Sequence, residues 1–399
     1  MESKISWLDF SETERRKMIE VISLFKQHDT RDEMGLAQIR DGFAEMFFPG
    51  TTTIQTRARY FLFIPWLYRY LEERKVPSTR ISDRMRQSEM QVMHALLNSG
   101  EPHNVIGQRA GSNLQRYPSS IYWNGLRTWG ILRFPGAIYQ YHRSLDRYYQ
   151  RIFLLPEIES TELIHDSTVN WDPSLPPKPD DFPEKVSFEI TNQEANYLRE
   201  RLLISCAQSL LAYLVDQCEP AEADFAWFHP DQASFPEHLR EKLSHAQNFS
   251  EALQGAGLLY NLMLAEKRAS NELINLYRER INKWYQRLQI NQRRLVTWDR
   301  KAFWRLTEQF GYVHPATQLF VNEWFGLPLN GNVVVDPVDN KNMRQSVHDR
   351  EYRLKRNRSR LENPRHLELW TGDAGTAQLE FRWGVGNRIA TDIQMGLRE

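Results

Sequence analysis

The sequence of 399 residues has very little cysteine and no long apolar run. Only Cys206 and Cys218 occur, so neither a disulfide framework nor a four-cysteine zinc site can form. The longest apolar run, residues 61–67, is interrupted by Pro65 and is far shorter than the ~20 residues that a membrane-spanning helix needs. The start, MESKISWLDFSETERRK, lacks the apolar core of a secretory signal. These absences predict a cytoplasmic protein with no membrane contact.

Catalytic motifs are also missing or incomplete. The eleven histidines form no H-E-x-x-H motif, and neither a P-loop nor a nucleophile elbow occurs. The segment KPDDFPEKVSFEIT contains Asp180, Asp181 and Glu189, which are candidates for the acidic residues of the PD-(D/E)xK motif of metal-dependent nucleases. Thr191, however, stands where that motif places its lysine. The sequence therefore predicts no catalytic residue, no metal and no cofactor, and it favours a non-enzymatic role over a divergent nuclease.

Aromatic residues and charges of both signs are abundant. Tryptophan, tyrosine and phenylalanine make up 12% of the chain, which is too aromatic for a disordered protein. The 51 basic and 51 acidic residues cancel overall but are segregated. Residues 1–52 carry −3, residues 53–155 carry +9, residues 156–252 carry −13 and residues 253–399 carry +7. Such segregation is informative about binding partners or about docking between segments of one chain, and not about the fold.

Apolar residues at helical spacing predict a mainly α, multi-helical protein. We expect an N-terminal basic helical domain over residues 1–155 and a C-terminal helical domain over residues 191–399. The acidic, proline-rich residues 156–190 would join them as a linker or as a strap on a surface. A short helix and an extended piece near 105–135 fit either a winged helix or an ordinary bundle. Further helices are predicted over residues 36–46, 236–246, 250–288, 298–310 and 315–325.

Three local signals concern particular helices. Thr191 and Glu194 form a T-x-x-E capping box, which predicts a helix start. Gly255 and Gly257 lie inside a helical pattern and would weaken the helix unless they allow a close contact. His314 precedes a proline and is interpreted as a capping or packing residue rather than a catalytic base.

The segment FFPGTTTIQTRARYFLFIPWLYRY places two arginines between a threonine run and an aromatic block. A helix beginning near Thr53 would put Arg57 and Arg59 in its first two turns, where a cation is disfavoured by about 0.3–1 kcal/mol. A phosphate would compensate if it were held by the hydroxyl groups of Thr52 and Thr53, the backbone N–H groups and the guanidinium groups. We therefore name these four residues as candidate phosphate ligands.

Internal carboxylates would compensate the same two arginines equally well. Asp41 and Glu45 are the candidates nearest in the sequence. Internal ion pairing is the more common arrangement, and it is the main alternative to a phosphate site.

A wider basic-aromatic region follows in the N-terminal half. Its candidate nucleic-acid-binding residues are Arg109, Arg116, Arg127 and Arg133, which alternate with tyrosine and tryptophan. This mixture suits contact with the nucleic-acid backbone combined with base stacking, and we expect DNA as the partner. Two alternatives remain: the aromatic rings fill the core while the arginines flank it, or the acidic segment of the same chain covers the basic face.

The segment RQSVHDREYRLKRNRSRLENPR predicts a basic amphipathic helix around residues 343–361. Val347, Leu354 and Leu361 are spaced by seven and share one face, with arginines roughly opposite. The candidate phosphate-binding residues here are Arg353, Arg356 and Arg360. A solvated helix surface and the binding of an acidic partner are the alternative interpretations.

Several blocks, including ISWLDFS, TRDEMGLAQIRDGFAEMFFPGTTTIQTRARYFLFIPWLYRYLE, ITNQEANYLRERL and LELWTGDAGTAQLEFRW, resemble an uncharacterised bacterial family. Its members are whole-chain proteins of about this length, catalogued as a domain of unknown function. The resemblance covers nearly all the chain. It implies a place in anti-phage defence islands, with a helicase, an ATPase or a phospholipase-D-like nuclease as protein partners, and it implies no catalytic residues.

These observations together predict a non-enzymatic subunit of a bacterial anti-phage defence complex. It would contact nucleic acid through the N-terminal basic-aromatic face and bind partner proteins through the remainder. The alternatives are a protein-interaction scaffold without nucleic-acid contact, and an effector nuclease with a divergent site.

Overall fold

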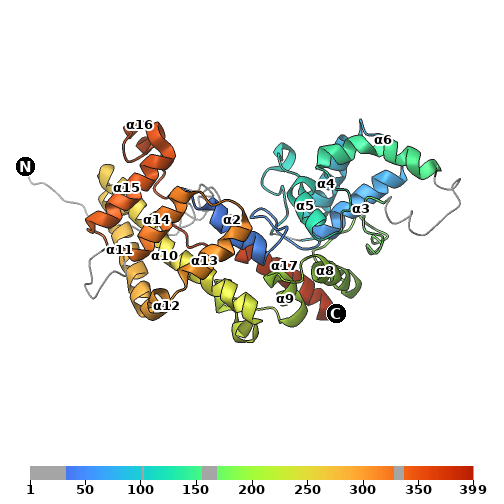
Figure 1. The fold of residues 1–399 in the computed structure, drawn as a ribbon. Coiled ribbons are helices and arrows are strands. Elements are labelled where there is room, and N and C mark those ends of the chain that lie inside the picture. Colours follow the sequence, from blue (N-terminus) through green and yellow to red (C-terminus); the bar gives the residue numbers. More distant parts are fainter. Residues whose placement is uncertain (1–32, 101–102, 155–168, 328–336, 399) are drawn as a thin grey trace, which may run out of the picture. The chain divides into compact units, whose positions relative to one another are not determined.

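The computed structural model describes most of the chain, namely residues 33–100, 103–154, 169–327 and 337–398. These ranges contain helices and no strand, apart from an isolated antiparallel bridge between Leu132 and Trp171 (Figure 1). The prediction of a mainly α, multi-helical protein is confirmed. Within the same ranges, every helix is either too short or too polar to cross a bilayer.

Contacts divide the chain into two compact units. Unit 1 takes the described residues up to Gly42 together with Ser244–Leu379, and unit 2 takes Phe43–Leu243 and Glu380–Glu399. The divisions fall inside α2 (Ala37–Phe47) and α10 (Glu237–Lys267). Each unit therefore combines segments that are far apart in the sequence. The domains expected from composition, residues 1–155 and 191–399 joined by 156–190, divide the chain at other positions. They remain a prediction.

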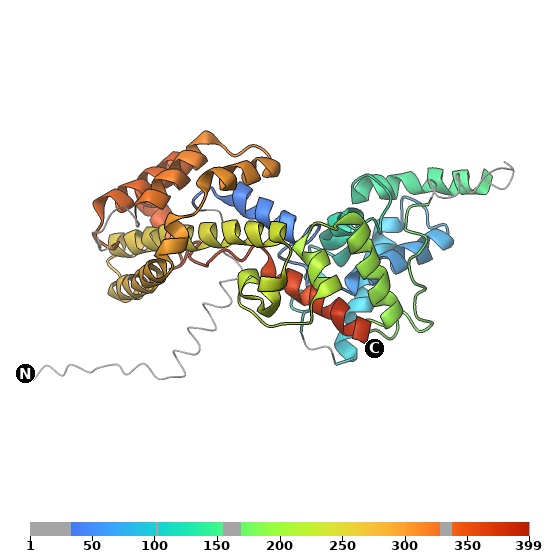
Figure 2. The same ribbon diagram turned by 60° about the horizontal axis from the view of Figure 1, so that its bottom comes forward.

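Unit 2 is built around α3, whose sequence YFLFIPWLYRYLEE is apolar on most sides and is buried over most of its length. Its α-helices are α3 (Tyr60–Glu73), α4 (Ile81–Asn98), α5 (Pro118–Thr128), α6 (Ile138–Leu154), α8 (Asn192–Ser205), α9 (Leu210–Gln217) and α17 (Trp383–Arg398). Short 3-10 helices are η1 (Gly111–Asn113), η3 (Ala226–Phe228) and η4 (Pro230–Ser234). The C-terminal helix α17 packs beside α8 and α9 (Figure 2).

The described part of the acidic, proline-rich segment, residues 169–190, packs onto α3. Trp171 stacks with Tyr68 at a centroid distance of 5.5 Å, and Phe182 stacks with Phe63 at 5.7 Å. The aromatic residues of this segment are buried, whereas most of its acidic residues are exposed. Residues 169–190 therefore form a strap on the surface of α3, while residues 156–168 lie outside the described ranges.

Unit 1 packs helices around α10. Its other elements are α11 (Asn271–Ile290), α12 (Gln292–Val296), α13 (Arg300–Thr307), η5 (Glu308–Phe310), α14 (Pro315–Gly326), α15 (Lys341–Lys355), η6 (Arg356–Arg358) and α16 (Pro364–Glu368). The close contact that would account for the two glycines of α10 is present. A Cβ on Gly255 would lie 2.1 Å from the Trp284 ring, and a Cβ on Gly257 would lie 2.3 Å from the carbonyl oxygen of Gly375.

The helix boundaries correct several predictions. One helix, α10, replaces the predicted break near residue 248, and it ends before Ala269, which adopts a positive φ of 51°. Helix α15 ends at Lys355 instead of continuing to residue 361, because Arg356 has a φ of 51° that is incompatible with an α-helix. The capping box at Thr191 and Glu194 is confirmed. The winged-helix element is not confirmed, since the described part of residues 105–135 contains only η1, α5 and one bridging residue.

Candidate nucleic-acid interface

Arg57 is paired with a carboxylate of the same chain. Its Nε donates to Asp392 Oδ2 at 2.9 Å, and the backbone N–H of Ala58 donates to the same oxygen at 2.8 Å. Burial raises the pKa of Asp392, and the Arg57 hydrogen bond and charge oppose that shift. The guanidinium group therefore serves to neutralise a buried acid in unit 2.

Arg59 is paired in the same way and is only 7% exposed. One terminal nitrogen donates to Glu194 at 2.8 Å, and the other donates to the carbonyl oxygen of Ser187 at 3.1 Å. Internal pairing is thus the arrangement that forms, but its acids are not Asp41 or Glu45. The actual partners follow 335 and 135 residues later in the chain, a distance that no local pattern reveals.

The predicted phosphate cradle is not assembled at a helix start. Helix α3 begins at Tyr60, so Thr52 and Thr53 lie in the turns before it rather than at its first turn. The backbone N–H groups of Thr56 and Arg57 are satisfied by the Tyr122 hydroxyl at 2.9 and 3.1 Å. We therefore remove Thr52, Thr53 and the two arginines from the candidate interface.

The remaining candidate arginines fall into two groups. Arg133 and Arg360 are paired internally, with Asp172 at 3.3 Å and with Glu33 at 3.1 Å respectively. The exposed group consists of Arg109, Arg116 and Arg127 in unit 2 and Arg353 and Arg356 in unit 1. Of the three arginines in the predicted basic helix, Arg360 is paired internally and the other two are exposed.

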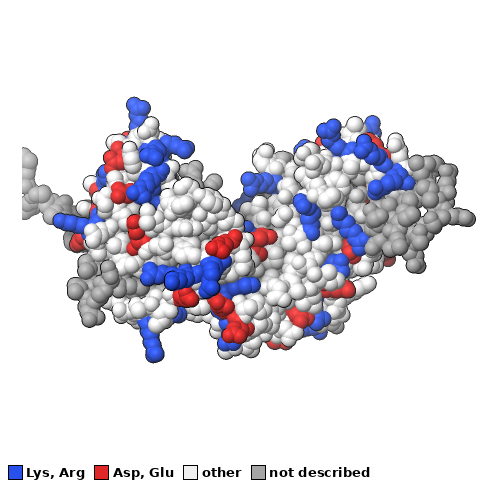
Figure 3. Space-filling view, viewed as in Figure 1, with Lys and Arg blue, Asp and Glu red and all other residues white. Residues whose placement is uncertain are grey.

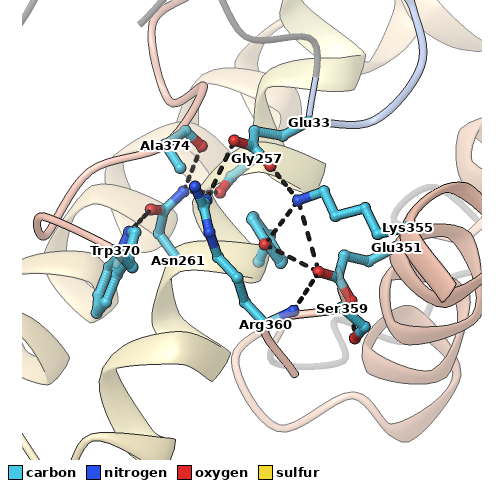
Figure 4. A network of polar contacts seen from close by, with 10 residues as sticks. Glu33, Gly257, Asn261, Glu351, Lys355, Ser359, Arg360, Trp370 and Ala374 are labelled. Carbon is cyan, nitrogen blue, oxygen red and sulfur yellow. Dashed lines mark hydrogen bonds and ion pairs between the residues drawn. The ribbon is translucent and has the colours of Figure 1, made fainter. Parts of the chain in front are cut away.

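Arg360 belongs to a buried polar network in unit 1 (Figure 4). Lys355 contacts Glu33, lies 3.5 Å from Glu351 and also donates to the Tyr260 hydroxyl at 3.0 Å. Glu351 is completely buried and accepts further hydrogen bonds from the Ser359 hydroxyl and from the backbone N–H of Arg360. Because two acids face two cations and each acid has several donors, the network is self-contained and fixes α15 against α10.

The Asn261 side chain lies beside the close approach at Gly257 and forms a second set of buried hydrogen bonds in unit 1. The Asn261 amide nitrogen donates to the carbonyl oxygens of Gly257 and Ala374, both at 2.7 Å. Its oxygen accepts from the Trp370 indole at 3.0 Å (Figure 4). All of these contacts are between groups of the chain itself, so this side chain has a structural role.

Exposed arginines on α4 and α6 were not among the candidates drawn from the sequence. Arg143 and Arg147 lie four residues apart on α6, so they share one face of the helix. Both are exposed, and neither has a carboxylate partner among the described residues. Lysine and arginine side chains gather over the α6 region of unit 2 in the space-filling view (Figure 3). The signal in the sequence was this four-residue spacing within YQYHRSLDRYYQR.

The N-terminal end of α4, which carries Arg86, lies near α6. Ser78, in the turn before α4, donates its backbone N–H to Asp146 of α6 at 2.9 Å. Burial, and then the nearby charge of Arg86, lower the pKa of His142 to about 4, so this histidine is neutral at pH 7. The Arg86 guanidinium also lies 5.8 Å from the ring centroid of Tyr117, the residue that follows Arg116 in the sequence. We define the α4–α6 face as Arg86, Arg116, Arg143 and Arg147.

Two buried acidic residues near this face contribute little negative charge, whereas Asp146 on α6 is exposed and its hydrogen bonds from Ser78 lower its pKa. Glu89 on α4 is 4% exposed, and burial raises its pKa to about 7. Burial also raises the pKa of Glu72, which accepts from the Tyr141 hydroxyl at 2.5 Å and from the Asn170 amide at 2.9 Å. Because both buried carboxyl groups resist ionisation, the exposed Asp146 and Asp83 are the acids that reduce the positive charge of the face.

A cluster of possible metal ligands is present in unit 2. Cys218, His229 and Asp231 place one ligand atom each within 4.8 Å of one another. However, His229 Nδ1 accepts the backbone N–H of Asp231 at 3.1 Å and caps η4. His314 caps α14 by the same contact with Ala316 at 3.1 Å, which confirms the capping interpretation. In the cluster, the His229 nitrogen nearest the Asp231 carboxylate is therefore already used in capping η4.

The acids considered for a nuclease do not gather into a metal site within the described ranges. Asp180, Asp181 and Glu189 are exposed, and Asp181 lies 3.8 Å from Lys185. The geometry therefore supplies no observation in favour of metal-dependent cleavage by these residues.

The chain belongs to DUF6361, a family of unknown function whose model matches residues 2–395. No curated protein and no solved structure matches the chain significantly.

Proposed function

We propose that this member of DUF6361 is a non-enzymatic, nucleic-acid-binding subunit of a bacterial anti-phage defence complex. It contacts the phosphate backbone through the α4–α6 face. The observation that carries the proposal is the pair Arg143 and Arg147, which are exposed on one side of α6 without a carboxylate partner among the described residues.

The charge arrangement supports a polyanionic ligand. Like charges four residues apart on a helix destabilise it by about 0.2–0.5 kcal/mol. The carboxylate between them, Asp146, accepts from Ser78 instead of pairing with either arginine. Arg86 has only a weak contact with Asp83 at 3.9 Å, and both of these side chains are more than half exposed. Phosphate groups satisfy several such guanidinium groups at once, through paired hydrogen bonds.

The defence assignment rests on the family resemblance and not on geometry. Under this proposal, a helicase, an ATPase or a phospholipase-D-like nuclease supplies the chemistry, and this chain supplies binding and positioning. An acidic protein is the competing ligand for the same arginines, and it defines the scaffold function without nucleic-acid contact.

Fluorescence anisotropy with labelled oligonucleotides tests the proposal. We expect binding at low salt that weakens steeply as salt rises. In a plot of the logarithm of the binding constant against the logarithm of the salt concentration, the magnitude of the slope should be about 0.9 per phosphate contact on duplex DNA and about 0.7 on a single strand. Replacing both Arg143 and Arg147 with alanine should reduce that slope by about 1.4–1.8. The matched control replaces Lys301 and Arg305, an exposed basic pair with the same spacing on α13 of unit 1.

The control pair should leave affinity unchanged, apart from a small general effect of net charge. Absence of binding to DNA and RNA at low salt would overturn the proposal. Equal losses from the α6 pair and the α13 pair would also overturn it, because binding would then follow total charge rather than this face.

A further inference from the structure

We infer that the nucleic acid at the α4–α6 face is single-stranded, and that Tyr139 stacks on one of its bases. This inference rests on the proposed function and names its substrate class. Tyr139 lies four residues before Arg143 and eight before Arg147 on α6, so the three side chains form one line along the helix.

Tyr139 has no structural task among the described residues. Its side chain is 61% exposed, whereas Tyr141 and Leu145 on the inner face of α6 are completely buried. Tyr141 contacts several rings of the core, including those of Tyr68 and Trp171. An exposed tyrosine beside unpaired arginines is a typical arrangement for binding a strand with accessible bases.

The spacing suits an extended strand. Four residues of an α-helix advance about 6 Å, so Tyr139, Arg143 and Arg147 extend over about 12 Å. Two phosphates can bind the arginines while a neighbouring base lies against the ring. A single strand running along α6 can therefore contact all three side chains, and no second strand is needed.

Stacking distinguishes a single strand from a duplex. In a duplex the flat faces of the bases are covered by their neighbours, and only base edges are accessible in the grooves. An exposed ring on a helix surface therefore gains little from a duplex, whereas every unpaired base offers a face to it.

Tyr117, the other aromatic residue near the face, does not share this role. It is half-buried, it precedes Pro118 as the N-cap residue of α5, and its ring lies near the Arg86 guanidinium. These contacts fix its ring within unit 2. Tyr139, which has no such contacts within the described residues, is therefore the residue whose replacement tests stacking.

The experiment compares a labelled single strand with a duplex of the same length, using the full chain and its variants. Tyr139→Ala should weaken binding to the single strand by about 5- to 150-fold, which corresponds to ~1–3 kcal/mol per stacked base, and should leave duplex binding unchanged. Tyr139→Phe keeps the ring and should retain affinity. Tyr312→Ala removes a 76% exposed ring from unit 1 and serves as the matched control.

The outcomes separate this inference from the proposed function. If the duplex binds as tightly as the single strand and Tyr139→Ala has no effect, the inference is wrong, while an effect of the Arg143 and Arg147 double variant would still support nucleic-acid binding. If neither oligonucleotide binds at low salt, the proposed function fails and this inference fails with it. Circular dichroism of Tyr139→Ala should match the wild type, because the side chain is exposed.

Discussion

The Arg59 guanidinium donates a hydrogen bond of 2.8 Å to Glu194, a residue 135 positions further along the chain. The other oxygen of Glu194 accepts the backbone N–H of Thr191 at 3.1 Å and completes the capping box of α8. One carboxylate therefore neutralises a buried arginine and fixes the start of a helix. One of the two arginines singled out next to the aromatic block thus stabilises unit 2 from within.

Replacing Arg59 with alanine should lower the free energy of unfolding by about 3–5 kcal/mol, because Glu194, 4% exposed, would keep a buried charge without its partner. Urea unfolding followed by circular dichroism measures the change. Arg143→Ala removes an exposed arginine and should change stability by no more than ~0.5 kcal/mol. Equal stability of the two variants would show that the buried pair contributes nothing.

The glycines of α10 give a prediction about packing. Gly255→Ala should destabilise the protein by about 1–3 kcal/mol, because its new methyl group would lie 2.1 Å from the Trp284 ring. Gly326→Ala, at the end of α14, has no neighbouring atom within 4 Å and should be neutral or stabilising by up to about 1 kcal/mol. Thermal unfolding of the two variants measures this difference, and an equally stable Gly255→Ala protein would contradict the close approach.

Glu89 makes stability depend on pH. Its Oε1 accepts the backbone N–H of Ser119 at 2.6 Å, while its Oε2 has no hydrogen-bond partner. Burial raises its pKa from 4.5 to about 7, so the folded state holds its proton more tightly than the unfolded state does. The contribution of this group to stability is therefore fully present below about pH 4.5 and is lost as pH rises through 7, by on the order of 3 kcal/mol.

Comparison with Glu89→Gln isolates this group from the other titrating residues. The glutamine keeps an oxygen that can accept from Ser119 but carries no charge. The difference in unfolding free energy between wild type and variant should shift in favour of the variant between pH 5 and pH 8. A constant difference across that interval would mean that Glu89 titrates at its ordinary pKa.

Asn261 is predicted to be intolerant of an apolar replacement. Asn261→Leu would leave the carbonyl oxygen of Ala374 and the indole N–H of Trp370 without the partner that Asn261 provides, whereas the Gly257 carbonyl keeps its helical hydrogen bond. At about 1–3 kcal/mol for each of these two buried groups, the loss should be at least ~2 kcal/mol in urea unfolding. Asn196→Leu, on the exposed surface of α8, is the control and should be close to neutral. A small loss at Asn261 would imply that water replaces these contacts.

Part of the fold follows from local patterns. The helical spacing of apolar residues predicted the helical class, and the T-x-x-E motif placed the start of α8 at Thr191. The glycines at 255 and 257 signalled the close contact that α10 makes. These signals succeed because a helix is stabilised by groups only three or four residues apart, which a sequence displays directly.

The candidate site was predicted less well. Composition indicated that the N-terminal half is basic, but it did not separate Arg57 and Arg59, which are paired internally, from Arg143 and Arg147, which are exposed. The start of α3 was placed too early, because Tyr122 satisfies backbone groups that a longer helix would have used. Each error came from a partner more than sixty residues away.

By itself, the sequence determined that this is a mainly helical protein with segregated charge, rich in aromatic residues, and it marked where particular helices begin and where backbones must approach closely. The tertiary structure decided which cations are neutralised and which remain available on α6. The physical reason is that an arginine is neutralised only where a carboxylate becomes its neighbour. That neighbour is set by the packing of distant segments, as Asp392 and Glu194 demonstrate.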